Sequence, residues 1–318
     1  MSDEATRIAA LTARLSPAGA GVVLGIGDDA AVLAPLSGGI VLTVDTSIEG
    51  VHFRREWAPL RTLARRAVVA AVSDLAAMGA KPRATLVALA LPADLGDDAF
   101  LALIDGTADA ARETGAALVG GNLSAASELS LTTTAVGEAG ARVLTRSGAR
   151  VGDGVYATGV LGAAALGLAH LTSGRAGEPG AAAFVARWCS PVARLDEGQA
   201  LVAAGASACI DVSDGLLRDL GQLCAASGVA AEVAVERLPM LAQQREQARA
   251  LGLDAEVLAL TGGEDYELVF TGAASAALDA LGTRLGRIVA GPPGEVRALD
   301  ANGQRLAVGA GGFEHFRG

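Results

Sequence analysis

The sequence predicts a two-domain protein of the α/β (α+β) class. The chain has 318 residues, which is more than one ordinary domain contains. Hydrophobic residues make up 51% and aromatic residues only 3%, so helices are expected to pack closely through small side chains. Segments with the spacing of strands alternate with segments of helical spacing along the whole chain, which is the pattern of mixed folds.

The first half of the chain is expected to alternate strands and helices. Residues 7–15 have helical spacing, and "AAVLAP" and "IVLTVD" are predicted to form a hairpin with "LSGG" as its turn. A long helix is expected from Leu60 to Met78, because Gly79 follows at the usual position of a helix C-cap. The pattern then predicts a strand at "ATLVALALP", a helix over Asp97–Thr114, and strands at "AALVGGN" and "LSLTTTAVGEA".

A polar, turn-rich stretch, "LTRSGARVGDGVYATG", divides the chain. We place the domain boundary there, so that the expected domains are residues 1–144 and 145–318. The second half continues the alternation, with a strand at Val155–Thr158, a helix after Gly162, a strand at Ala208–Val212, a helix from Asp214 and a strand at Tyr266–Phe270.

The composition argues against several classes of function. The formal charge is −10 and no run of Lys or Arg occurs, which argues against a nucleic-acid surface. If an acidic protein binds a phosphorylated ligand, metal ions and arginine side chains must neutralise the negative charge of that ligand. The three cysteines match neither a zinc site nor a disulfide framework, and the N-terminus carries no export signal. No apolar run is long enough for a membrane span, so a cytoplasmic location is expected.

Three carboxylates are expected to meet at one end of the predicted hairpin. A glycine-rich turn leads into Asp28 and Asp29, where a phosphate-binding loop would carry a lysine. Pairing of the two strands would bring them close to Asp45, with the Thr43 hydroxyl on the same face. Like charges on neighbouring strands repel, and a divalent cation bound by oxygens would compensate. The alternative is that these aspartates are only turn and cap residues, but their convergence favours a metal site.

Further acids follow in the middle of the chain. Asp74 lies in an otherwise apolar helix, where a carboxylate needs a partner such as a metal ion. An exposed position near the end of that helix is the alternative, although the helix dipole disfavours it. In "IDVSDGLLRDL", Asp211 ends a strand, and Ser213 and Asp214 precede a helix. This place suits a phosphate or metal-phosphate contact. A simple N-cap is the stronger alternative for Ser213 taken alone, and a site is favoured only because another cluster of acids at a strand end has already appeared.

Three other polar positions are candidates. In "TGGEDYELVF" two glycines allow a close backbone approach before Glu264 and Asp265, although the segment could be an ordinary tight loop. His52 follows Asp45 closely, but a lone histidine is more often structural or solvated than catalytic. Arg146, in the interdomain "TRSGA", could reach a phosphate or be an exposed linker arginine.

The order of its motifs gives the chain a specific resemblance. The segments "GIGDDAAVL", "VDTSIEGVHF", "AVSDLAAMGAKP", "TRSGARVGDGVYATG", "DVSDGLLRDL" and "TGGEDYELVF", with "GGFEHF" near the C-terminus, resemble the motifs of thiamine-monophosphate kinases. That family is similar to aminoimidazole ribonucleotide synthetase, selenophosphate synthetase and the hydrogenase-maturation dehydratase. The resemblance implies a two-domain aminoimidazole ribonucleotide synthetase-like fold. Its N-terminal domain would bind metal and ATP and form a homodimer through its sheet, and its C-terminal domain would be α+β.

The resemblance also implies an activity and the residues for it. The γ-phosphoryl group of ATP would be transferred to thiamine monophosphate, giving thiamine diphosphate and ADP, with several Mg2+ ions in the cleft between domains. Magnesium is assigned to Asp28, Thr43, the Val44 main chain, Asp45, Asp74, Asp211 and Asp214, among which Asp45, Asp74 and Asp211 are expected to be catalytic. ATP is assigned to Gly121, Asn122, Arg146 and Ser213, and thiamine monophosphate to His52, Thr261, Glu264 and Phe313.

The chain departs from the family pattern at "GGNLS", residues 120–124, where the family has Gly-Gly-Asp-Thr-Thr. Asn122 stands at the position of a magnesium-binding aspartate, and its amide oxygen can still ligate the ion but brings no charge. The alternative function is therefore a weakened homologue, or a module that binds nucleotide and thiamine phosphate without turnover. A further alternative is the activity of another ATP-dependent member of the superfamily, and two such activities, hydrogenase maturation and selenophosphate synthesis, are disfavoured. The C-terminus lacks the cysteine of hydrogenase maturation, and no cysteine stands near the N-terminal glycine turn, as selenophosphate synthesis would need.

Overall fold

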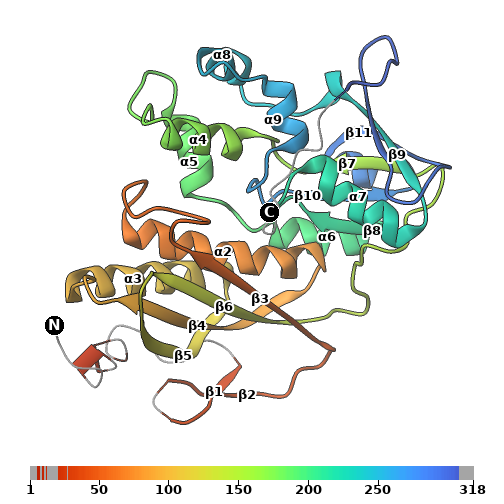
Figure 1. The fold of residues 1–318 in the computed structure, drawn as a ribbon. Helices are drawn as coiled ribbons and strands as arrows, with labels where there is room; N and C mark the ends of the chain where they lie inside the picture. Colours follow the sequence, from red (N-terminus) through yellow and green to blue (C-terminus); the bar gives the residue numbers. More distant parts are fainter. Residues whose placement is uncertain (1–5, 8, 11, 13–20, 27, 308–318) are drawn as a thin grey trace. The chain divides into compact units, whose positions relative to one another are not determined.

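The structure is a computed structural model that describes residues 6, 7, 9, 10, 12, 21–26 and 28–307 (Figure 1). The chain divides into two compact units. The first contains the described residues up to Leu75 together with Ala80–Ala141, and the second contains Ala76–Gly79 and the described residues from Arg142 onward. None of the helices in the described part of the chain is both long and apolar enough to cross a membrane.

The first unit is built on a four-stranded sheet with the strand order β3-β6-β4-β5. Strand β6 pairs antiparallel with both β3 and β4, whereas β4 and β5 are parallel and are joined by a crossover through helix α3. Strands β3 and β5 are thus the two edges of this sheet. The strands are β3 (Ile40–Ile48), β4 (Lys81–Pro92), β5 (Ala117–Ala126) and β6 (Ser130–Glu138).

Helices α2 (Leu60–Ala77) and α3 (Asp97–Thr114) lie on one side of this sheet (Figure 1). Both predicted helices are confirmed, and α3 begins and ends at the predicted residues. Helix α3 ends where Gly115 takes a φ of 71°, the left-handed conformation that glycine adopts at low cost.

The predicted hairpin is wrong. Strand β2 (Val32–Leu33) pairs with β1 (Val22–Leu24), and β3 pairs with β6 along all nine of its residues. The reason lies in the "LSGG" segment, which is held by the Glu138 carboxylate at the end of β6. Oε1 of Glu138 accepts hydrogen bonds from the Ser37 N–H (2.8 Å), the Ser37 hydroxyl (2.6 Å) and the Gly38 N–H (3.1 Å).

The same carboxylate makes the first unit sensitive to acid. Hydrogen bonds from Ser37 and then from Arg83 lower the pKa of Glu138 from 4.5 to about 2. Because the folded pKa is the lower one, the stabilisation is complete above about pH 4.5 and disappears as the pH falls toward 2. We expect Glu138→Gln to be less stable than the parent at pH 6, with the difference shrinking toward pH 2. Denaturant unfolding across this pH range measures it, and a constant difference would contradict the assignment.

The second unit contains a six-stranded sheet with the order β12-β9-β11-β7-β10-β8. All neighbouring strands are antiparallel except β12 and β9. The strands are β7 (Gly154–Ala157), β8 (Ala208–Asp211), β9 (Ala230–Ala234), β10 (Leu268–Gly272), β11 (Thr283–Val289) and β12 (Val296–Leu299).

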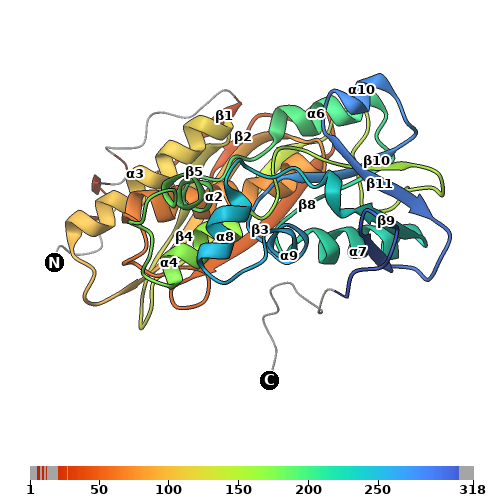
Figure 2. The same cartoon turned by 90° about the horizontal axis from the view of Figure 1, so that it is seen from above.

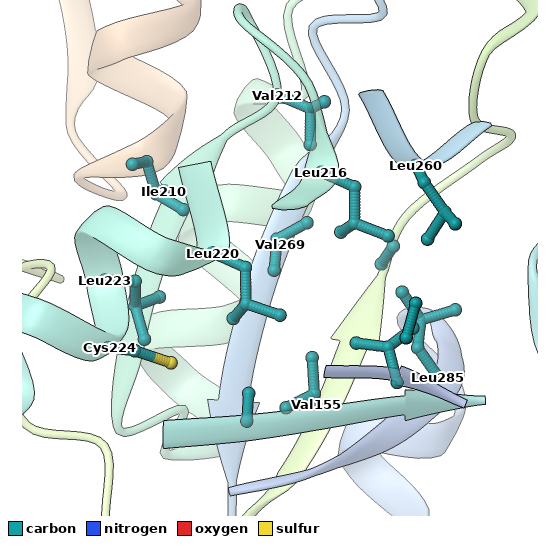
Figure 3. Close-up of a cluster of buried hydrophobic side chains, with 14 of the residues drawn as sticks. Val155, Ile210, Val212, Leu216, Leu220, Leu223, Cys224, Leu260, Val269 and Leu285 are labelled. Carbon is teal, nitrogen blue, oxygen red and sulfur yellow. The ribbon is translucent and has the colours of Figure 1, made fainter. Parts of the chain in front are cut away.

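Helices cover both faces of this second sheet. Helix α7 lies along one face beside β8 and β9 (Figure 2), where Leu216, Leu220 and Leu223 form an apolar stripe at helical spacing. The stripe packs on Val155 and Val269 of the sheet (Figure 3). On the other face, α6 and α10 pack against an aromatic pair from β7 and β10. The helices are α4 (Ala163–Thr172), α5 (Ala182–Cys189), α6 (Leu195–Ala204), α7 (Leu216–Ser227), α8 (Gln244–Ala250), α9 (Ala255–Thr261) and α10 (Ala276–Asp279), with a 3-10 turn η1 (Val235–Arg237).

Several helix glycines allow helices to touch through their backbones, as at Gly106 and Gly167. A Cβ added to Gly106 of α3 would lie 2.1 Å from the carbonyl oxygen of Arg61 in α2. A Cβ added to Gly167 of α4 would lie 2.1 Å from the carbonyl oxygen of Phe184 in α5. Real Cβ atoms do not come so close, so any side chain here would push the helices apart. The prediction of close packing through small side chains is confirmed at both places, and the predicted mixed α/β class is confirmed for the chain.

Candidate active site

The first unit brings Thr43 and Asp74 together. Thr43 lies on β3 and its partner on β6, Ala135, is buried, so Thr43 shares the face of the sheet that the helices cover. Its hydroxyl donates a hydrogen bond to Oδ2 of Asp74 on α2. Asp45 follows two residues along β3 on the same face, and its carboxylate is exposed and accepts the Thr46 N–H at 2.7 Å. Thr43 and Asp74 are therefore in contact and Asp45 follows on the same face of β3, whereas the predicted Asp28 lies on another segment.

Asp28 lies between β1 and β2, where its carboxylate accepts the Asp29 N–H at 2.8 Å. The convergence of Asp28, Asp29 and Asp45 was argued from the hairpin, and it fails with the hairpin because β2 pairs with β1. Among the described residues, no three His, Cys, Asp or Glu side chains lie close enough together to hold a metal ion.

The donor chemistry nevertheless fits magnesium. The candidate ligands supply only oxygens, from carboxylates, a hydroxyl and the Val44 main chain. Mg2+ prefers oxygen ligands, keeps several waters, and is usually held by one or two carboxylates together with phosphates of the substrate. The Thr43–Asp74 pair with nearby Asp45 meets this requirement, and so do Asp211 and Asp214 in the second unit.

Gly121 and Asn122 lie on β5, at the opposite edge of the sheet from β3. Asp45 pairs with Thr133, Thr133 with Val87, and Val87 with Gly121, so one row crosses the whole sheet. Three strand spacings separate its ends by roughly 14 Å. Asn122 belongs to the next row and points to the other face, where its amide donates to the Ser124 hydroxyl at 2.7 Å. Within one chain the sheet therefore does not bring Asn122 together with Asp45.

His52 follows β3, and its ring is fixed by the backbone that precedes it. Nδ1 accepts the Ile48 N–H at 3.0 Å, and the His52 N–H donates to the Ile48 carbonyl at 2.9 Å. A ring nitrogen that accepts a hydrogen bond carries no proton. The neutral imidazole of His52 therefore carries its proton on Nε2.

In the second unit two predicted loops cross. The Ser213 carbonyl accepts the Glu264 N–H at 2.8 Å, and the Val212 carbonyl accepts the Tyr266 N–H at 2.9 Å. Gly263 permits the crossing, because a Cβ there would lie 2.2 Å from the Ser213 carbonyl oxygen. The sequence motifs "DVSDG" and "TGGEDY", which were singled out separately, thus form one braced structure.

The first of these loops carries two candidate acids and hides a third. Asp211, at the end of β8, is 5% exposed, and Asp214 is half-buried with its carboxylate 3.4 Å from Nε of Arg218. Asp219 is 1% exposed, and its Oδ2 accepts the N–H groups of Asp214 and Gly215, both at 3.0 Å. Burial raises the pKa of Asp219 to about 7, against the opposing effect of these backbone hydrogen bonds. Sequence reasoning missed Asp219, although an acid in the first turn of a helix, five residues after Asp214, was a signal for a capping role.

The second loop is anchored at three positions, Glu264, Asp265 and Glu267. Glu264 takes a φ of 69°, which is uncommon outside glycine, and accepts a hydrogen bond from the indole N–H of buried Trp188. Oδ2 of Asp265 accepts the Gly162 N–H at 2.5 Å and Oδ1 accepts the Ala164 N–H at 3.0 Å, capping α4. Burial raises the pKa of Asp265 to about 7. Sequence reasoning found Glu264 but missed Trp188.

Glu267 forms the third anchor, inside a buried ion-pair network. Its carboxylate is 1% exposed and accepts two hydrogen bonds from Arg194, through Nε and Nη2, both at 2.6 Å. Arg187 donates to Oε1 at 2.6 Å and the Thr158 hydroxyl donates to Oε2 at 2.7 Å. The carboxylate is therefore fully satisfied.

Of the remaining predicted residues of this unit, Arg146 lies apart from the crossing and Phe313 outside the described residues, whereas Thr261 lies against the crossing, its carbonyl oxygen 2.6 Å from where a Cβ of Gly215 would stand. Nη1 of Arg146 donates to Gln222 in the middle of α7 at 2.9 Å, and the Arg146 carbonyl accepts the hydroxyl of Ser227, at the end of α7 that is remote from Ser213, at 2.9 Å. The Thr261 hydroxyl donates to the Val257 carbonyl at 2.8 Å, within the last turn of α9. Phe313 lies outside the described residues.

Comparison with known proteins places this geometry in a family. The family model described as "AIR synthase related protein, N-terminal domain" matches residues 27–139, and the corresponding C-terminal domain matches residues 150–298. The thiamine-monophosphate kinase of Escherichia coli (strain K12) is 38% identical over 312 residues, which cover 93% of this chain and 92% of that protein.

Two solved structures agree with this. The thiamine-monophosphate kinase of Stenotrophomonas maltophilia K279a has a TM-score of 0.81 and 36% identity, covering 95% of this chain and 96% of that one. The structure described as "AaThiL complexed with AMPPCP and TMP" has a TM-score of 0.81 and 33% identity over 92% of both chains. The resemblance recognised in the motifs and the fold it implies are confirmed. The chain belongs to the thiamine-monophosphate kinase family of AIR synthase related proteins.

Proposed function

We propose that this protein transfers the γ-phosphoryl group of ATP to thiamine monophosphate, forming thiamine diphosphate and ADP. One observation carries the proposal: the chain is similar, over 92% of both lengths, to a structure complexed with AMPPCP and TMP. ATP is the co-substrate in this reaction. The three free cysteines are typical of a reducing compartment, and we place the protein in the cytoplasm.

Each of the two proposed domains contributes part of the machinery in this proposal. In the first, residues 1–144, Asp45 and Asp74 are catalytic metal ligands, helped by Asp28, Thr43 and the Val44 main chain. In the second, residues 145–318, Asp211 is catalytic and holds metal with Asp214. Several magnesium ions, when bound, neutralise the charge of the phosphates. The remaining contacts are Gly121, Asn122, Arg146 and Ser213 for ATP, and His52, Thr261, Glu264 and Phe313 for thiamine monophosphate.

The reaction needs positioning more than it needs a base. A phosphate oxygen of thiamine monophosphate, ionised near neutral pH, forms a bond to the γ-phosphorus while the bond from that phosphorus to the β–γ bridging oxygen breaks. ADP leaves with the electron pair. Because two anions must be brought into line, the chain's task is to hold them and to orient them. The Glu264 carboxylate, oriented by Trp188, offers a negative charge to the cationic thiazolium ring.

The test is product formation by the purified protein. ATP, Mg2+ and thiamine monophosphate are incubated with the full chain, and thiamine diphosphate and ADP are quantified by chromatography, with EDTA as the control. We expect equal amounts of the two products, and none with EDTA. ADP without thiamine diphosphate would contradict the proposed acceptor.

We propose further that the protein is a homodimer formed through the sheet of the first unit. Ile40, Leu42 and Val44 alternate along edge strand β3 on the face opposite the helices, and they are 66%, 66% and 63% exposed. A contiguous apolar stripe on a sheet usually marks an interaction surface. Analytical ultracentrifugation should give twice the 31.5 kDa of one chain, and a mass of one chain would contradict the dimer.

Asn122 supports a second candidate function, a weakened or non-catalytic homologue that binds nucleotide and thiamine phosphate. We expect Asn122→Asp to lower the Mg2+ concentration for half-maximal rate several-fold, because a carboxylate adds the charge that an amide lacks. Initial rates across a Mg2+ titration measure it, with Ser124→Ala as the control that removes only the hydrogen-bond partner of Asn122. An unchanged titration curve would remove Asn122 from the metal site.

A further inference from the structure

The loop of residues 212–215 has the position of a phosphate-binding loop, between the end of β8 and the start of α7. Backbone N–H groups in such a place ordinarily bind anions, because they are unpaired and the helix dipole favours negative charge. In this protein the N–H groups of Asp214 and Gly215 instead donate to Oδ2 of Asp219, both at 3.0 Å. A side chain of the protein thus occupies the anion position.

The carbonyl groups of the same loop are also occupied. Ser213 and Val212 accept hydrogen bonds from Glu264 and Tyr266, at 2.8 and 2.9 Å. Gly215 has a φ of 124°, and a Cβ there would lie 2.6 Å from the Thr261 carbonyl oxygen. The backbone of the loop is therefore fixed on both sides by the protein itself. What it can offer a ligand are the side chains that it carries.

We propose that Asp219 is a positioning residue that makes this loop bind a cation and not an anion. Its carboxylate takes the N–H groups that would otherwise bind phosphate, and it fixes the backbone so that Asp211 and Asp214 hold a divalent cation, through which a phosphate is bound. The proposal rests on the proposed function and deepens it. It assigns the phosphate contact of this loop to its side chains and to the metal that they hold, and it excludes a direct contact with the backbone.

The donor set is consistent with this role. Asp211 and Asp214 supply carboxylate oxygens, the ligands that Mg2+ and Mn2+ prefer. Asp219 is 1% exposed and lies behind the loop, so it is not itself a ligand in this arrangement. Groups that orient metal ligands typically change metal affinity by about 10–100-fold when they are replaced.

The experiment measures Mn2+ binding to the full chain without nucleotide, by the electron paramagnetic resonance signal of free Mn2+. Three variants are compared with the parent: Asp219→Asn, Asp214→Asn and Asp153→Asn. Asp153 is the matched control, since it is also buried and accepts a backbone N–H (Arg150, 3.0 Å) and a hydroxyl (Ser207, 2.7 Å). It precedes β7 at the end remote from the loop.

We expect Asp214→Asn to remove one Mn2+ site. We expect Asp219→Asn to lower the Mn2+ affinity of that same site by about tenfold or more. Asp153→Asn should lower the melting temperature but leave Mn2+ binding within about twofold of the parent. Equal Mn2+ binding by Asp219→Asn and Asp153→Asn would overturn the proposal. Unchanged Mn2+ binding by Asp214→Asn would also overturn the proposal. That result could be obtained with a protein that phosphorylates thiamine monophosphate, so failure of this proposal is distinguishable from failure of the kinase assignment.

A measurement on the parent protein covers the case in which Asp219→Asn does not fold. Residue-resolved hydrogen exchange of the Asp214 and Gly215 amides is followed without ligand and with AMPPCP and Mn2+. We expect both amides to be protected in the free protein and to change little with nucleotide. Free exchange that becomes slow only when nucleotide is added would show direct phosphate binding and would overturn the proposal.

Discussion

Replacing Asp45 with alanine is expected to lower the rate of thiamine diphosphate formation by about 10²–10³-fold, which is roughly 3–4 kcal/mol of transition-state stabilisation. The reason is that Asp45 lies on the same face of β3 as Thr43, two residues along the strand, and Thr43 forms a pair of oxygen donors with Asp74. Initial rates at saturating ATP and Mg2+ measure the loss.

The fold should survive this substitution. Asp45 is exposed, and its side chain accepts only the adjacent Thr46 N–H among the hydrogen bonds described for it. Asp98→Ala is the matched control, an exposed carboxylate of the same unit in the first turn of α3. It should retain the parent rate. A variant at Asp45 that is folded by circular dichroism and as active as Asp98→Ala would remove Asp45 from the metal site.

The second large effect is on stability. Glu267→Gln is expected to destabilise the second unit by about 3–5 kcal/mol, the usual cost of breaking a buried ion pair by changing one partner. Arg194 and Arg187 would then face a neutral amide in place of a carboxylate that is 1% exposed. Hydrogen bonds are lost as well as charge. The NH2 group of the glutamine amide is a donor, and it would stand where a carboxylate oxygen of Glu267 now accepts hydrogen bonds.

Glu197→Gln provides the comparison for Glu267. Glu197 pairs with the same arginine, through Nη1 of Arg194 at 3.2 Å, but its side chain is 34% exposed. Exposed pairs contribute about 0–1 kcal/mol, so this variant should unfold close to the parent in a denaturant titration. Similar unfolding of the two variants would mean that the buried network is not a major source of stability.

Helices were predictable from the sequence because their signals are local. The helical spacing and the following glycines place α2 from Leu60 and α3 over Asp97–Thr114, as observed. Strand pairing was not predictable in the same way. The "LSGG" segment reads as a hairpin turn, but Ser37 is bound by a carboxylate 101 residues away, and this distant contact decides where β3 pairs.

The residues of the candidate site also differ in whether a local sequence signal reveals them. Asp45 and Asp211 could be singled out because they lie at the ends of predicted strands, Asp74 because it is a carboxylate in an otherwise apolar helix, and Asp214 because it precedes a helix. Trp188 could not, since its importance lies in a hydrogen bond to Glu264, 76 residues further on. Asp219 is closer in sequence, and its place in the first turn of a helix signals a capping role, but nothing in the motif says that the chain folds over it and buries it.

The helix glycines Gly106 and Gly167 have a consequence for anyone who wishes to engineer a more heat-resistant form of this protein. Replacing glycine by alanine inside a helix commonly gains about 1 kcal/mol, and automated schemes choose such sites first. Gly106 and Gly167 would be selected by that rule, yet each faces the carbonyl group of another helix 2.1 Å from where the methyl group would stand. The substitution that the rule favours would therefore have the opposite sign here. Helix–helix distances, as well as helix propensity, decide which glycines of this chain can be changed.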